Sequence, residues 1–214
     1  LEDISKNKSP NVVTMINTIK PYGRWEKICG KGRILPAFPG AGGCIEGGIL
    51  DAQLLPRAIQ PTTFGEIGGR KSSREEALAY IFRKSHIPYQ IVPEMHHWQI
   101  SHLGVIIPLA DAYYQSRHPE KICANEKLMT LTAYRMKKNL KWIAQKGMLC
   151  PAKLYMIKDM PTGMLARVLS RVYQSEFGNR FLYRHAMHAP EEFQRLHQEF
   201  YNYMKTHTKE SNKA

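Results

Sequence analysis

The sequence predicts an α/β part followed by an all-α part. Short apolar runs separated by Gly and Pro fill residues 1–92, which is typical of strands alternating with turns. From about residue 94, apolar residues recur instead at the three- and four-residue spacing of helices. We therefore expect an α/β domain over 1–93, a helical domain over 94–206 and a polar tail over 207–214.

The expected strands come first along the chain. They are Asn11–Asn17, Ile34–Phe38, Gly48–Leu55, Thr62–Ile67 and Tyr89–Val92. Between the last two, Ser73 and Glu76 have the spacing of a capping box, in which the side chains of a helix's first turn bond its free amides. This pattern predicts a helix that begins at Ser73 and ends at His86.

The helical half has one strongly periodic face. It consists of Met129, Ala133, Met136, Leu140 and Ile143, spaced by four, three, four and three residues. Asn125 is a good N-cap for this helix and Gly147 a good C-terminal stop. A second periodic helix opens at Pro190 and carries Phe193, Leu196, Phe200 and Tyr203. Residues 95–116 and 162–175 are also expected to be helical.

Composition and charge limit the possible functions. The chain has 214 residues, 43% of them hydrophobic, which is enough for a core and excludes general disorder. Its longest apolar stretch, 103–110, is far shorter than the roughly 20 residues of a membrane span. The four cysteines form no C-x-x-C pair, which favours reduced thiols in a cytoplasmic protein.

The net charge is +13, from 31 Lys and Arg against 18 Asp and Glu. Three interpretations remain open: an anionic partner, a solvated basic face without a role, or a piece of a longer protein whose acidic N-terminal part is missing, since the chain starts at Leu1. The basic residues form no stripe interleaved with aromatic residues, so we expect no nucleic-acid partner and no membrane partner.

Glycines follow the strand Ile34–Phe38. The stretch Phe38–Gly43 lacks both G-K-[ST] and G-x-G-x-x-G, so a tight structural turn is favoured over a loop that holds phosphate. Asn17 ends the first strand, at the kind of position where open α/β sheets bind ligands, although a turn-forming Asn explains it equally. Glu66 is compatible with solvent or with a cleft.

The histidines invite a metal interpretation. His96, His97 and His102 lie close together, and His185 and His188 have helical spacing. No H-E-x-x-H motif and no Cys partner accompanies them, so we expect no metal site.

Four segments taken in order resemble the ketopantoate reductase family. They are Asn11–Asn17, Phe38–Gly43, Thr62–Gly69 and Trp98–Leu109, and the resemblance covers residues 10–112. Beyond residue 112 only the helical character agrees.

The resemblance implies an NADP-dependent reductase of a small 2-keto acid. It implies a Rossmann-like domain, a helical C-terminal domain and an active site between them. The family's dinucleotide fingerprint has no counterpart here, so we expect residues 1–93 to form only the back part of a Rossmann-like sheet and to bind NADP poorly. Asn17, Phe38 and Gly40 are the positions implied for the cofactor, and Asn17 also for the substrate.

The family's catalytic Lys, just after a Trp, corresponds here to Gln99. Two Asn of the same family helix correspond to Leu103 and Ile107. Glutamine donates a hydrogen bond but delivers no proton. His102, three residues further along the same helix face, is therefore the candidate proton donor, with an ordinary helix histidine as the alternative.

A late family Glu that holds substrate and cofactor corresponds to Glu192. Arg180 and Arg184 precede it and favour an anionic substrate, since guanidinium pairs with carboxylate. The alternative is that Glu191 and Glu192 only complement the dipole at a helix N-terminus. The candidate catalytic residues are thus Gln99, His102 and Glu192, and Arg184 is a candidate for the substrate.

A second class of function also fits the sequence. The chain is then a non-catalytic family member or a helical dimerisation or binding module. Aromatic residues of the helical half suit the interface of a homodimer and suit a core equally well. They are Tyr113, Tyr114, Trp142, Tyr201 and Tyr203.

Overall fold

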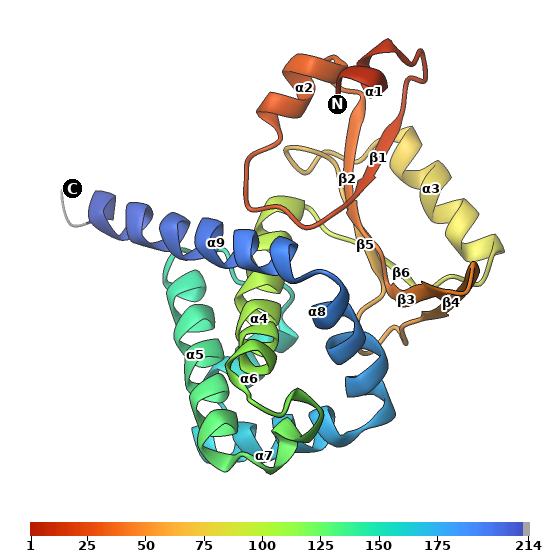
Figure 1. Cartoon of the computed structure of the whole chain (residues 1–214). Coiled ribbons are helices and arrows are strands. Elements are labelled where there is room, and N and C mark those ends of the chain that lie inside the picture. The colour runs from red at the N-terminus through yellow and green to blue at the C-terminus, as the bar shows by residue number, and fades with distance from the viewer. Residues whose placement is uncertain (212–214) are drawn as a thin grey trace. The chain divides into compact units, whose positions relative to one another are not determined.

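The computed structural model describes residues 1–211. The chain divides into two compact units, one of Leu1–Gly42 with Asp51–His96 and the other of Gly43–Leu50 with His97–Ala214. Strands and short helices occupy the red-to-yellow part of the chain in Figure 1, and helices occupy the green-to-blue part. The predicted order, α/β first and all-α second, is confirmed. Within residues 1–211, none of the helices combines the length and apolar character needed to cross a bilayer.

A four-stranded mixed sheet organises the first unit. Its strands are β1 (Val12–Met15), β2 (Ile34–Phe38), β5 (Thr62–Phe64) and β6 (Tyr89–Ile91), and their order is β1-β2-β5-β6. β1 runs parallel to β2 and β5 parallel to β6, while β2 and β5 are antiparallel. The sequence predicts all four strands, mostly with bounds that are too wide.

Helix α3 (Ser73–Lys84) covers a face of this sheet. Its Ala79 and Phe82 pack with Leu35, Ala37 and Phe64 in one buried cluster. This burial of apolar surface fixes the helix on the sheet.

The start and end of α3 differ from the prediction. The N-cap is Ser72 rather than Ser73, and its hydroxyl accepts a hydrogen bond from the Glu75 backbone N–H at 3.2 Å. Two adjacent serines and two adjacent glutamates fit the capping pattern in either register, so the sequence did not distinguish them. The helix ends at Lys84, and His86 has a φ of 54°.

Two strands form a separate hairpin, β3 (Ala41–Glu46) and β4 (Ile49–Leu54). Gly47 and Gly48 make its turn with φ of 57° and 80°, the positive values that two-residue hairpin turns require. The prediction of a turn over Phe38–Gly43 was therefore too long, because β3 begins at Ala41. Glycine has a low strand propensity, which hid this strand in the sequence. Two short helices, α1 (Glu2–Lys6) and α2 (Gly23–Cys29), were also missed.

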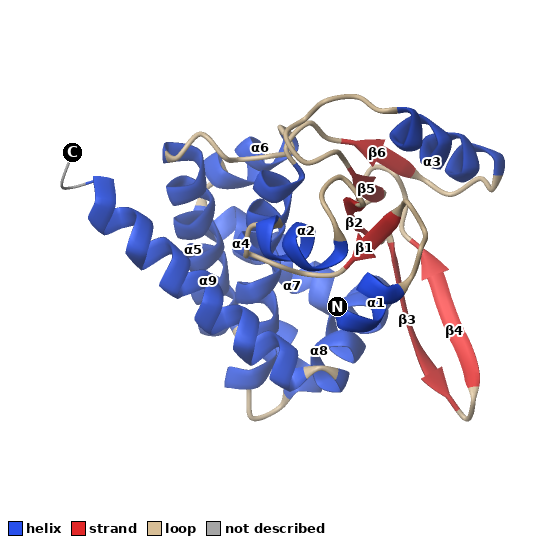
Figure 2. Ribbon diagram, turned by 90° about the horizontal axis from the view of Figure 1, so that it is seen from above, coloured by secondary structure: helices blue, strands red, loops and turns tan. Residues whose placement is uncertain are grey.

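The second unit is built from helices. They are α4 (Met95–Gln115), which begins in the first unit, α5 (Glu126–Gln145), α6 (Lys153–Asp159), α7 (Thr162–Gln174), α8 (Arg184–His188) and α9 (Pro190–Ser211), with a 3-10 turn at Pro119–Ala124 and a π-helical turn at Gly178–Tyr183. Helices α4, α5, α7 and α9 were predicted. Figure 2 shows them as the large group of blue ribbons.

The periodic face of α5 is buried as predicted. All five of its apolar residues are buried, and Asn125 caps the helix by accepting a hydrogen bond from the Leu128 N–H at 3.0 Å. Gly147 follows the helix with a φ of 70°. Gly104 of α4 lets the helices approach, since a Cβ there would lie 2.7 Å from Ile143 of α5 and 3.7 Å from Phe200 of α9.

Helix α9 continues into the segment that was expected to be a polar tail. His207 Nδ1 lies 2.9 Å from the Tyr203 carbonyl oxygen, and Lys146 donates to the His207 carbonyl oxygen at 2.8 Å. Trp142 donates from Nε1 to Thr208 at 2.8 Å. These contacts hold the last turns against α5. Residues 212–214 of that expected tail lie outside the described residues.

Candidate functional site

Two of the predicted site residues follow parallel strands of the first unit. Strand β1 ends at Met15, two residues before Asn17, where the sequence predicted its end. Phe38 is the last residue of β2. Met15 pairs with Ala37, so the carboxyl ends of β1 and β2 meet at one edge of the sheet. Asn17 and Phe38 are both partly buried there. This edge is where open α/β sheets place ligands.

Gly40 has a structural explanation. A Cβ at this position would lie 2.3 Å from the Thr62 nitrogen and 2.5 Å from the Pro61 carbonyl carbon. The Gly40 N–H donates to the Thr62 hydroxyl at 3.0 Å. The chain's own backbone fills the space that the missing side chain leaves, so Gly40 offers no cradle to a phosphate.

The segment after β1 gives no phosphate cradle either. The helix that follows, α2, has seven residues, and the loop from Ile16 to Tyr22 contains no glycine. A dinucleotide pyrophosphate is normally held by a glycine turn that leads directly into a helix N-terminus. The described residues of the first unit therefore do not fit NADP, and no hydride step is assigned to them.

Glu66, left open by the sequence, is a buried partner of Arg74. It is 8% exposed, and its two carboxylate oxygens accept from Arg74 Nε at 2.6 Å and from an Arg74 terminal nitrogen at 2.5 Å. The same guanidinium donates to the Ile34 carbonyl oxygen at 3.0 Å. The hydrogen bonds from Arg74, and a further one from Ser72, lower the pKa of Glu66 below its usual value, although burial opposes this shift. Glu66 thus ties the start of α3 to β2 and is structural.

His102, the candidate proton donor, stacks on Trp98 one turn earlier in α4. The ring centroids lie 5.0 Å apart and the ring planes differ by 9°. Burial, together with the nearby His185, lowers the pKa of His102 to about 3. The imidazole is therefore neutral at neutral pH. A neutral ring donates one hydrogen bond but is not poised to deliver a proton in this range.

His185 connects this pair of rings to α9. Loss of solvation lowers the pKa of His185, and the carboxylate of Glu192 acts in the opposite direction. The His185 ring meets Phe193, the neighbour of Glu192, edge-on at 5.2 Å. His102, His185 and Glu192 thus form a chain of electrostatic neighbours across α4, α8 and α9, which we call the histidine cluster.

Tyr114 borders the histidine cluster. Its hydroxyl donates to the Ala186 carbonyl oxygen at 2.7 Å. Burial raises the pKa of Tyr114 to about 12, with smaller contributions from Asp111 and Glu192. The phenol therefore stays protonated and holds α4 against α8.

The remaining predicted residues of this unit lie close in sequence to the histidine cluster. Gln99 is on α4 beside Trp98 and is 2% exposed. Arg184 is the first residue of α8, next to His185, and is partly buried. Its carbonyl oxygen lies 2.7 Å from His188 Nδ1. The second unit thus brings the predicted His102 and Glu192 near His185, a histidine that was considered only as a metal ligand, and Arg184 is adjacent to His185 in sequence.

A further pair was missed by the sequence reasoning. His197 Nδ1 on α9 lies 2.9 Å and 3.0 Å from the two carboxylate oxygens of Asp111 on α4. Burial raises the pKa of Asp111, and His197 opposes that shift. The two residues are far apart in sequence, and no local spacing relates them.

The histidines that are close in sequence do not gather at one metal site. His96 Nε2 lies 2.8 Å from the Ile19 carbonyl oxygen in the first unit. Among the described residues, no three His, Cys, Asp or Glu side chains are placed to hold a metal ion.

The aromatic residues considered for an interface make contacts within the second unit. Tyr113 is 2% exposed and packs edge-on against Tyr173 and Tyr183, with ring centroids 4.9 Å and 5.5 Å away. Trp142 meets Tyr203 at 6.1 Å. Tyr113 is therefore a core residue, whereas Trp142 and Tyr203 pack against each other and stay partly exposed.

The fold and the site together define a class of protein. It has a mixed α/β sheet unit followed by an all-α unit that carries the partly exposed histidine cluster. Among solved structures, the chain is similar to 2-dehydropantoate 2-reductase from Porphyromonas gingivalis W83, with a TM-score of 0.45 and 12% identity. The match covers 84% of this chain and 63% of that enzyme. A likeness this distant defines neither family nor activity. No protein-family model matches the sequence, and no curated protein does.

Proposed function

We propose that the chain is the substrate-binding part of a reductase of the ketopantoate reductase type and that its helical unit binds a small 2-keto acid. The observation that carries the proposal is the histidine cluster. Glu192, which the sequence resemblance implies for catalysis, is linked electrostatically through His185 to His102, the candidate replacement for the family's Lys. NADP is the reductant implied by the resemblance, and the proposal concerns the substrate alone.

Each group has a role that matches its chemistry. A neutral His102 donates a hydrogen bond to the keto oxygen and polarises the carbonyl, as neutral imidazoles do when their pKa is held low. The Arg184 guanidinium pairs with the substrate carboxylate. The carboxylate of Glu192 attracts the His185 ring electrostatically and thereby helps to position the ring next to His102.

The binding test compares two acids that differ only in the keto group. Isothermal titration with 2-oxobutanoate and with butanoate is expected to show tighter binding of the keto acid, by about tenfold, which corresponds to about 1.4 kcal/mol. His102→Phe removes the donor but keeps a flat ring on Trp98, and should abolish this preference. Equal affinity for both acids in the unchanged protein would contradict the role of His102.

The anion partner is tested separately. Arg184→Met should lower the affinity for both acids by about tenfold, because charge-assisted hydrogen bonds are worth about 1.5–3 kcal/mol. Arg167→Met, at an exposed position on α7, removes the same charge and should leave both affinities unchanged. Identical behaviour of the two variants would overturn the assignment of Arg184.

The described residues of the first unit do not fit NADP, so the chain by itself is expected to consume no NADPH with any 2-keto acid. The titrations therefore test the substrate part of the proposal. Consumption of NADPH by the chain alone would contradict the stated misfit of the first unit to the dinucleotide.

A further inference from the structure

A basic cavity lies on α5, apart from the histidine cluster. Its volume is about 440 Å³, and its walls include Lys137, Lys138, Lys141 and the rings of Tyr134 and Trp142. Thr162 of α7 and Met204 of α9 complete the walls. None of the lining side chains is acidic. A cavity of this size suits a small organic molecule.

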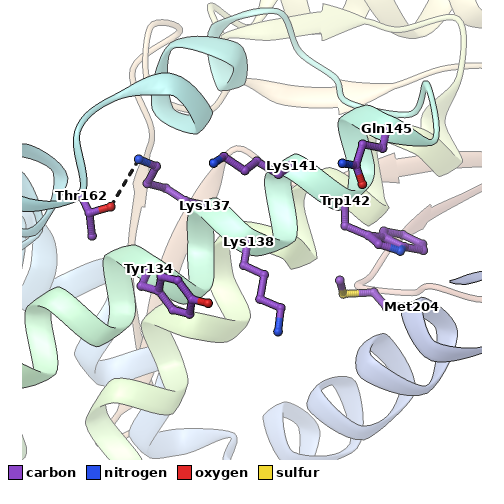
Figure 3. Close-up of a pocket in the computed structure, with 8 residues that line it drawn as sticks. All are labelled: Tyr134, Lys137, Lys138, Lys141, Trp142, Gln145, Thr162 and Met204. Atoms are coloured by element: carbon purple, nitrogen blue, oxygen red, sulfur yellow. Dashed lines mark hydrogen bonds between the residues drawn. The ribbon is translucent and has the colours of Figure 1, made fainter.

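The lysines concentrate positive charge that no carboxylate among the lining residues balances. Lys137 and Lys141 are four residues apart on one helix face, where like charges destabilise a helix by about 0.2–0.5 kcal/mol. In Figure 3 both side chains extend toward the Thr162 side of the view, and Lys137 donates to the Thr162 hydroxyl at 3.3 Å. An anion between these donors would relieve the repulsion, so this end of the cavity favours a negatively charged group.

Thr162 adds backbone donors to the same end. It begins α7, a helix of 13 residues whose first turn carries no acidic residue and whose N-cap makes no side-chain hydrogen bond. A side chain at Gly163 would have no heavy atom within 4 Å, so the first turn is sterically open. The amides of such a turn favour a phosphate.

The aromatic rings supply a flat apolar surface. Tyr134 is 57% exposed. The Trp142 indole is held in place because its N–H donates to Thr208 at 2.8 Å and its ring meets Tyr203. Aromatic faces of this kind stack on nucleobases and similar rings.

We infer that this cavity binds a small phosphomonoester that carries a flat ring, such as a nucleoside monophosphate. The phosphate lies between Lys137, Lys141 and Thr162, and the ring lies on Trp142. Nothing in this site is shared with the histidine cluster, so the inference stands independently of the proposed function.

Isothermal titration with AMP tests the inference, with adenosine and inorganic phosphate as separate probes. AMP is expected to bind at least about tenfold more tightly than either probe, because only AMP uses both ends of the cavity. Binding should weaken as ionic strength rises, since the lysines are close to solvent. No heat of binding with AMP, or equal affinity for inorganic phosphate, would overturn the inference.

Matched charge variants separate the site from the overall basic charge. The double variant Lys137→Met/Lys141→Met should lower the affinity for AMP by about tenfold or more. Lys121→Met/Lys127→Met removes two exposed lysines near the start of α5, outside the cavity, and should change the affinity less than about twofold. Equal weakening in both double variants would show nonspecific attraction and contradict the site.

A ring variant completes the design. Trp142→Leu should lower the affinity for AMP several-fold and leave the weak binding of inorganic phosphate unchanged. Unaltered AMP binding in this variant would contradict stacking on Trp142.

Discussion

At the scale of single residues, the burial of the His102 ring makes the stability of the fold depend on pH. Its pKa is about 3 in the folded chain and about 6.5 when unfolded, so between these values only the unfolded state binds the proton. The stability that comes from the neutral ring is complete above pH ~6.5 and is lost as the pH falls toward ~3. The slope is at most about 1.4 kcal/mol per pH unit.

His102→Phe removes this titration and keeps an aromatic ring on Trp98. The free energy of unfolding, measured with urea between pH ~7 and ~5, should therefore fall less steeply in the variant than in the unchanged protein. Parallel pH dependences of the two proteins would contradict the low pKa of His102.

Arg74 shows how a buried carboxylate is stabilised. Arg74→Met leaves Glu66 charged, largely buried and without its guanidinium, and should lower the free energy of unfolding by about 3 kcal/mol. Arg70→Met, an exposed neighbour, should change it by less than about 0.5 kcal/mol. Urea denaturation measures both, and similar losses would argue against the buried pair.

The sequence revealed residues whose partners are local and missed those whose partners are distant. Asn125 was recognised as a cap because its partner amide lies three residues away. Arg74 and His197 were not recognised as partners of Glu66 and Asp111, because only the fold brings those pairs together. For the histidine cluster, the resemblance supplied Glu192, the helix-face spacing from Gln99 supplied His102, and the structure adds His185.

At the scale of secondary-structure elements, Gly40 limits how the link from β2 to β3 packs. Gly40→Ala would push a methyl group into the backbone of Pro61 and Thr62 and should cost about 1–3 kcal/mol or more. Gly23→Ala is the control, because a Cβ at the start of α2 meets no atom within 4 Å. It should be neutral or stabilising by up to about 1 kcal/mol. Thermal unfolding compares them, and equal stability of the two variants would contradict the packing argument.

The sequence predicted the long helices and missed the shortest ones. Helices α4, α5 and α9 span several turns and each was predicted, and in α5 and α9 the apolar periodicity is clear. Helices α1 and α2 span about one or two turns and give no comparable pattern. The strand β3 was missed because two of its six residues are glycine.

At the scale of the whole molecule, the change of periodicity near residue 93 predicted the order of the two kinds of structure. It did not predict that β2 and β5 are antiparallel, because strand direction depends on how the intervening β3–β4 hairpin routes the chain. The charge of +13 is also distributed in a way that composition does not reveal. Three lysines line one cavity on α5, while the histidine cluster contains the neutral imidazole of His102 and is bordered by the phenol of Tyr114.

The central claim is that the histidine cluster of the helical unit recognises a 2-keto acid. Nuclear magnetic resonance of the histidine rings tests it most directly, with 2-oxobutanoate added at neutral pH. The account predicts saturable shifts of the His102 and His185 ring signals, while the ring of His197, paired with Asp111, stays unchanged. Shifts confined to His197, or no shift at any histidine, would contradict it.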